Sequence, residues 1–114
     1  MGVGGSPSRR PIGSMQRLVR QLHLELDGNT PELLEGKFDA SVATTGVGLY
    51  TITFNEAYLR KPICLGSGAE ADVSVAFDNV ATGTVDVIVT DLAGLAKDAI
   101  VHLLINGYDT TDAI

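Results

Sequence analysis

The chain has 114 residues, of which 45% are hydrophobic and 19% charged, and its net charge at pH 7 is −6. This length suits one domain with a single buried core. The lone cysteine, Cys64, excludes an intrachain disulfide, and no apolar run reaches the about 20 residues that a membrane-spanning helix requires. We therefore expect neither a disulfide-stabilised scaffold nor a membrane partner.

The charges are unevenly distributed along the sequence. Residues 1–24 contain four arginines and no acid, whereas residues 25–114 contain 4 basic and 14 acidic residues. A basic segment beside an acidic body predicts docking on an acidic protein surface, including that of a second copy. No nucleic-acid partner is expected, because the acidic body would repel phosphate. The predicted docking residues are Arg9, Arg10, Arg17 and Arg20.

Residues 1–15 are predicted to form an N-terminal arm, either flexible or docked. The segment up to Ser14 is rich in Gly, Ser and Pro, so alone it cannot bury enough apolar surface to fold. It is either a native arm or an addition ahead of the folded part, because patterned sequence begins directly after Met15. Residues 16–114 are predicted to form a single β domain.

The first strand of this domain begins at Gln16, and turn-forming residues 27–29 end it. The next stretch, TPELLEG at 30–36, predicts one helical turn, because Thr is a favoured N-cap and Pro suits the first helical position. One face of the first strand is predicted to hold Arg20, Leu22, Leu24 and Leu26.

Further strands are predicted from alternating or β-branched sequence at 38–42, 49–54, 63–65, 73–77, 85–90 and 99–109. In the first two, shared faces are predicted for Phe38, Ala40 and Val42, and for Tyr50, Ile52 and Phe54. Short strands that recur about every ten residues, separated by Gly, Asn and Asp, are typical of all-β sandwiches and barrels. The predicted fold is an antiparallel β-sandwich or a jelly-roll-like barrel.

His102 is the better of two candidates for a catalytic base, within the apolar run AIVHLLINGYD at 99–109. A triad also needs a nucleophile and an orienting acid, and no Gly-x-Ser-x-Gly motif accompanies His102. We therefore predict a non-enzyme without catalytic residues, in which His102 is a partly buried or interface residue of a strand. A small hydrolase that depends on His102 is the competing hypothesis.

No metal or cofactor is expected, because the carboxylates lack the spacing of a calcium loop and the single cysteine and two distant histidines do not match a zinc site. The glycines of GVGL and GSGA are interpreted as turn residues. Asn106-Gly107 resembles a hairpin turn, but only seven residues follow, so a bulge or a kink at the chain end is the alternative. Tyr108 suits an interface, since its ring packs while its hydroxyl hydrogen-bonds.

Two segments, TGVGLYTITFNEAYLRKPICL (45–65) and AKDAIVHLLINGYDTTDAI (96–114), resemble small all-β virion proteins of tailed bacteriophages. These are the capsid decoration or cement proteins and related tail-fibre modules. The resemblance covers roughly residues 16–114 and rests on pattern more than on identity. It implies a structural protein on the capsid surface, a homotrimer that binds the major capsid protein and stabilises the assembled head.

The resulting hypothesis is a capsid decoration protein that docks through its arginines. The alternative is a tail-fibre or spike module that binds a host-surface glycan, because similar sandwiches host lectins. Sugar stacking requires exposed aromatic rings, and Tyr50 and Phe54 are predicted to face inward. Contacts between subunits are predicted for Val101, His102, Leu103, Tyr108 and Ile114.

Overall fold

The computed structural model describes the backbone of residues 16–113 and the side chains of residues 19–109. These residues form eight strands and no helix. The strands are β2 (Gln16–Asp27), β3 (Glu32–Glu35), β4 (Ala40–Gly46), β5 (Leu49–Phe54), β6 (Ile63–Gly68), β7 (Ser74–Asp78), β8 (Thr84–Thr90) and β9 (Ile100–Ala113).

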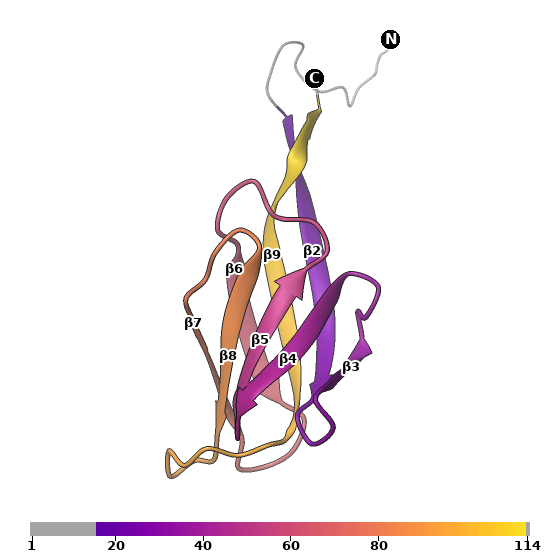
Figure 1. Ribbon diagram of the computed structural model, residues 1–114. Coiled ribbons are helices and arrows are strands. Elements are labelled where there is room, and N and C mark those ends of the chain that lie inside the picture. Colours follow the sequence, from indigo (N-terminus) through magenta and orange to yellow (C-terminus); the bar gives the residue numbers. More distant parts are fainter. Residues whose placement is uncertain (1–15, 114) are drawn as a thin grey trace.

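The strands form two four-stranded antiparallel sheets that pack face to face (Figure 1). The first sheet has the order β3-β2-β9-β6, and the second has the order β4-β5-β8-β7. Strands β2 and β9 pair along most of their length in the middle of the first sheet. The predicted all-β antiparallel sandwich is thus confirmed.

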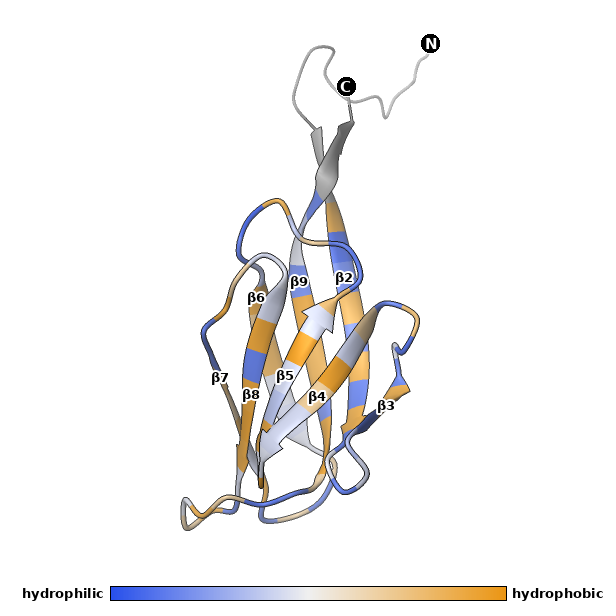
Figure 2. Cartoon of the chain, in the orientation of Figure 1, coloured by the Kyte–Doolittle hydropathy of each residue, from blue (hydrophilic) through white to orange (hydrophobic). Residues whose placement is uncertain are grey.

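The core lies between the two sheets and takes every second residue of the central strands. Figure 2 shows the resulting bands of apolar and polar residues along β2. Tyr50, Ile52 and Phe54 all point inward, as their alternation predicts. Each fully buried aliphatic side chain stabilises the fold by about 1.5–3 kcal/mol. The fully buried large side chains are Leu24, Leu26, Tyr50, Ile52, Tyr58, Val85, Val87, Val89, Val101, Leu103 and Ile105.

Two local predictions are wrong. The stretch 30–36 contains no helical turn, because residues 32–35 form β3 along the edge of β2, where Leu33 enters the core. Phe38 does not share the inward face of Ala40 and Val42, because β4 begins only at Ala40. Phe38 lies in the turn before β4, with 86% of its surface exposed.

The predicted subunit contacts of Val101 and Leu103 are also wrong. Both side chains are completely buried, and β9 pairs them with Leu26 and Leu24 of β2, which point into the same core. A side chain without surface in the folded chain cannot contact a second subunit. The opposite face of β9, which carries His102 and Tyr108, is the one open to partners.

The glycines of the GSGA segment lie within β6, so their interpretation as turn residues is wrong. A Cβ atom on Gly66 would lie only 2.7 Å from Cγ1 of Val75 in the second sheet. Glycine therefore lets β6 and β7 approach each other closely across the core.

The Asn106-Gly107 dipeptide forms no hairpin, because β9 continues through it and Gly107 pairs with Arg20 of β2. The register between β2 and β9 becomes irregular just beyond Tyr108, as the bulge alternative anticipates. Gly107 itself serves a close packing contact. A Cβ atom there would lie 2.8 Å from Cδ1 of Tyr58 and 3.0 Å from Cβ of Pro62.

One hydrogen-bonded cluster joins the turns at one end of the sandwich. The Tyr50 hydroxyl hydrogen-bonds to the Asp98 carboxylate and lies 3.2 Å from the Gly28 carbonyl oxygen, and the Gly48 N–H donates to the same carboxylate at 2.8 Å. The hydrogen bond from Tyr50 holds the pKa of Asp98 below its usual value, while burial raises the pKa of Tyr50. The cluster ties the turns after β2 and β4 to the segment that leads into β9.

Substitution of Gly107 by alanine should destabilise the protein by about 1–3 kcal/mol, because the added methyl group would clash with Tyr58 and Pro62. Gly83→Ala is the matched control, since a Cβ atom there would have no neighbour within 4 Å. Urea unfolding of both variants measures the difference. Equal unfolding midpoints for Gly107→Ala and Gly83→Ala would contradict the packing role of Gly107.

Candidate functional site

The outer face of the first sheet is the candidate interaction surface. Its side chains come from the outward positions of β2, β9 and β6, which alternate with the core residues of the same strands. The strand registers place Val19 opposite Tyr108 and Leu65 opposite Leu104. We call this surface the β2–β9–β6 face, and its apolar members include Val19, Ile63, Leu65, Leu104 and Tyr108.

Several of these apolar side chains are well exposed on the open sheet. Ile63 has 67% of its surface exposed, Leu65 59% and Tyr108 44%. Leu104 is half-buried between its neighbours on adjacent strands. Single exposed apolar residues are ordinary, whereas a contiguous group on a regular sheet marks a surface that contacts another molecule.

The chain's two histidines meet on this face. Nε2 of His23 lies 3.3 Å from Nδ1 of His102, and the two rings are stacked with centroids 5.5 Å apart. A hydrogen bond between two imidazoles requires one nitrogen to accept, so at least one ring is neutral in this arrangement. The pair borders a shallow hollow of about 550 Å³, together with Leu65, Ser67 and Leu104.

The surroundings of His102 bear on the competing hydrolase hypothesis. The registers place Ser67 of β6 and Glu25 of β2 on either side of His102. Within the described part of the chain, however, the side-chain hydrogen bond of His102 goes to His23, and none joins it to Ser67 or Glu25. The connected nucleophile, base and acid that acyl transfer requires are therefore not assembled here.

Among residues 19–109, no three His, Cys, Asp or Glu side chains are grouped so that they could hold a metal ion. The described part of the chain also contains no helix long and apolar enough to cross a bilayer. Cys64 is half-buried beneath the sheet, and burial raises the pKa of its thiol, which disfavours the reactive thiolate.

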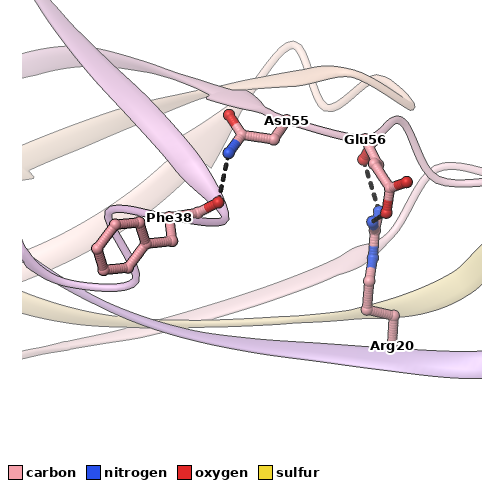
Figure 3. A network of polar contacts seen from close by, with 4 residues as sticks. All are labelled: Arg20, Phe38, Asn55 and Glu56. Atoms are coloured by element: carbon pink, nitrogen blue, oxygen red, sulfur yellow. Dashed lines mark hydrogen bonds and ion pairs between the residues drawn. The ribbon is translucent and has the colours of Figure 1, made fainter.

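Arg20 is the predicted docking arginine whose side chain the structure describes, and its guanidinium is engaged within the chain. It lies 4.1 Å from the centroid of the Tyr58 ring. Its Nη2 donates to the Glu56 carbonyl oxygen at 2.6 Å, and its Nη1 pairs with Oε1 of Glu56 at 3.3 Å (Figure 3). Only 18% of the side chain is exposed, so Arg20 acts mainly to hold the segment after β5 against β2.

The other predicted contact residues divide between this face and the parts of the chain that are not described. His102 and Tyr108 lie on the β2–β9–β6 face, where a second subunit could reach them. Arg9, Arg10 and Ile114 lie outside the described residues, as does the side chain of Arg17. Docking through the arginines and a contact by Ile114 therefore stay predictions.

Sequence reasoning missed the contributions of His23, Ile63 and Leu65 to this face. The partner of His23 lies 79 positions away in the sequence, so local pattern cannot reveal the pair. Ile63 and Leu65 carried a usable signal, since both are apolar and lie on the same face of a short strand. That signal shows a shared face and does not show which side of the sheet it occupies.

Comparisons of the chain with protein-family models, with curated proteins and with solved structures find no match. Function must therefore be argued from the fold and from the chemistry of the exposed surfaces. Among these surfaces, the β2–β9–β6 face combines exposed apolar side chains with the His23–His102 pair and the adjoining hollow.

Proposed function

We propose that this protein is a non-enzymatic structural protein that self-associates through the β2–β9–β6 face and acts as a capsid decoration protein of a bacteriophage head. The observation that carries the proposal is the contiguous group of exposed apolar side chains on the regular part of the first sheet. Burial of such a group between subunits removes apolar surface from water, which drives association.

The face is well suited to association because it needs little ordering when it binds. Its side chains stand on three hydrogen-bonded strands whose other sides are fixed by the core. A preorganised surface loses less conformational entropy on binding than a mobile one. Closed symmetric oligomers are the common result of self-association, and a homotrimer is the form that the phage resemblance suggests.

Decoration of a capsid would follow from binding without any chemical step. A protein that binds the assembled lattice and not its free subunits stabilises that lattice by mass action. The basic N-terminal segment would bind an acidic patch of the major capsid protein, while the acidic body, which holds all 14 acidic residues, stays in solvent. The protein would then lie on the outer surface of the virion.

A tail-fibre or spike module that binds a host glycan is the second candidate. The sequence disfavours it because the central aromatic residues face inward, but the ring of Phe38 is largely exposed. That observation supplies the stacking surface that the sequence did not predict.

Replacement of Leu65 by glutamate should abolish self-association, because a charge would be buried in the apolar contact. Thr53→Glu, on the outer face of the second sheet, is the matched control, since Thr53 is also an exposed strand residue. Light scattering at increasing protein concentration should give an oligomer for wild type and Thr53→Glu and a monomer for Leu65→Glu. A monomeric wild type, or an oligomeric Leu65→Glu variant, would refute the proposed interface.

The decoration role itself is tested on the parent particle. Quantitative mass spectrometry of purified virions should find the protein in numbers comparable to the major capsid protein, and release of the protein should lower the temperature at which the head opens. A copy number of only a few per particle, with labelling at the tail, would replace decoration with the fibre hypothesis. Absence from the virion would exclude both.

A further inference from the structure

The segment between β8 and β9 exposes two large apolar side chains close together in the chain. Leu92 has 74% of its surface exposed and Leu95 66%. In Figure 1 this segment projects sideways from the end of the sandwich at which β9 begins. We call residues 91–95 the leucine loop. Two leucines exposed on one protruding loop present an apolar surface to another molecule.

Hydrogen bonds hold the leucine loop in one conformation. The backbone N–H of Asp91 donates to the Leu95 carbonyl oxygen at 2.8 Å, and Oδ1 of Asp91 accepts from the N–H groups of Ala93 and Leu95, each at 2.9 Å. From outside the loop, Oδ1 of Asp72 accepts from the Leu92 N–H at 2.9 Å. The two leucines are thus carried by an ordered backbone, which lowers the conformational entropy lost on binding.

A homotrimer requires two different contact surfaces on each copy. When one surface meets the same surface of a second copy, the contact has two-fold symmetry and closes a dimer. A ring of three forms only when one surface meets a different one. The β2–β9–β6 face is one of the two surfaces. The leucine loop lies outside that face, so it can supply the other.

The hollow on the β2–β9–β6 face suits the apolar part of the leucine loop. Its volume of about 550 Å³ lies within the range of about 300–1,000 Å³ that is typical of ligand pockets, so it has room for two side chains. Leu65, Leu103 and Leu104 supply apolar lining. Contact between leucines of the two copies removes apolar surface from water, which favours association.

The polar groups of the two surfaces are complementary as well. Beside the loop leucines, Asp72 and Asp91 use Oδ1 within the chain, and among residues 19–109 neither Oδ2 has a hydrogen bond. In the hollow, the His23–His102 hydrogen bond uses one nitrogen of each ring, and in either tautomer one of the two remaining nitrogens carries a proton. The hollow therefore offers an N–H donor and the loop offers carboxylate acceptors, which form the stronger, charge-assisted type of hydrogen bond.

We propose that the leucine loop of one copy inserts into the hollow on the β2–β9–β6 face of the next copy, so that the subunits join head to tail. Leu92 and Leu95 contact the apolar lining of the hollow, and the carboxylates of Asp72 and Asp91 accept hydrogen bonds from the histidine pair. This inference rests on the proposed self-association and adds the surface that the face binds. Three such contacts close the homotrimer.

Replacement of Leu92 by glutamate should lower the mass measured by light scattering threefold, from trimer to monomer, because a charge would enter the apolar contact. Leu95→Glu is a second variant that should have the same effect. Phe38→Glu is the matched control and should keep the trimer mass, since Phe38 is an exposed apolar residue outside both surfaces. All three side chains are exposed, so urea unfolding should give each variant the wild-type midpoint.

A mixture of variants distinguishes a head-to-tail contact from a face-to-face one. Leu65→Glu keeps an intact leucine loop and Leu92→Glu keeps an intact hollow, so the two monomers should bind each other. In ¹H–¹⁵N NMR spectra of labelled Leu92→Glu, the amide signals of His23 and His102 should shift when unlabelled Leu65→Glu is added. They should stay in place when the added protein carries both substitutions, because it lacks the loop contact.

The inference fails if either loop variant remains oligomeric while Leu65→Glu is monomeric. Self-association through the face would stand in that case, but the face would bind a different surface. The inference also fails if the mixture leaves the histidine signals in place, or if Phe38→Glu is monomeric like the loop variants. A monomeric wild type would refute the self-association itself and this inference with it.

Discussion

The structure depends on the pairing of β2 with β9 in the middle of the first sheet. This ladder joins two strands at opposite ends of the described chain, and it continues from the pair of Asp27 and Ile100 to that of Gln16 and Ala113. Each strand contributes one row of buried side chains to the core and one row to the outside. The core row stabilises the sandwich, and the outer row forms the surface on which we base the proposed function.

The pairing of β2 with β9 also explains the position of His102, the residue that the sequence offers as a candidate catalytic base. His102 lies on the outer row of β9, where it meets His23 of β2 and not a nucleophile. Leu65 and Leu104 lie beside this pair, together with the polar residues Gln21 and Ser67. Surfaces through which proteins associate commonly carry such a mixture of polar and apolar groups.

The sequence predicts the strands and most of their inward faces, because in a strand with one apolar and one polar row the apolar row faces the core. The prediction of the inward face fails at β9, because both rows of this strand are largely apolar. The pattern does not show whether Val101 and Leu103 or His102 and Leu104 face the core. The pairing with β2 places Val101 and Leu103 inside. The stretch 32–35 likewise carries local helix-start signals, but the free edge of β2 pairs with it.

The candidate sites were less predictable than the fold, because they join residues that are far apart in sequence. The histidine pair of the β2–β9–β6 face joins residues 79 positions apart on β2 and β9, and no local pattern encodes that meeting.

The central claim is that the β2–β9–β6 face is covered in the working assembly, and the chain's two histidines report on it directly. Diethyl pyrocarbonate labelling, read by mass spectrometry of the peptides that contain His23 and His102, measures their accessibility. We expect both histidines to react much more slowly at concentrations where the protein is oligomeric than after dilution to the monomer. Equal labelling rates in the two states would contradict the account, because the face would then remain open to solvent in the assembly.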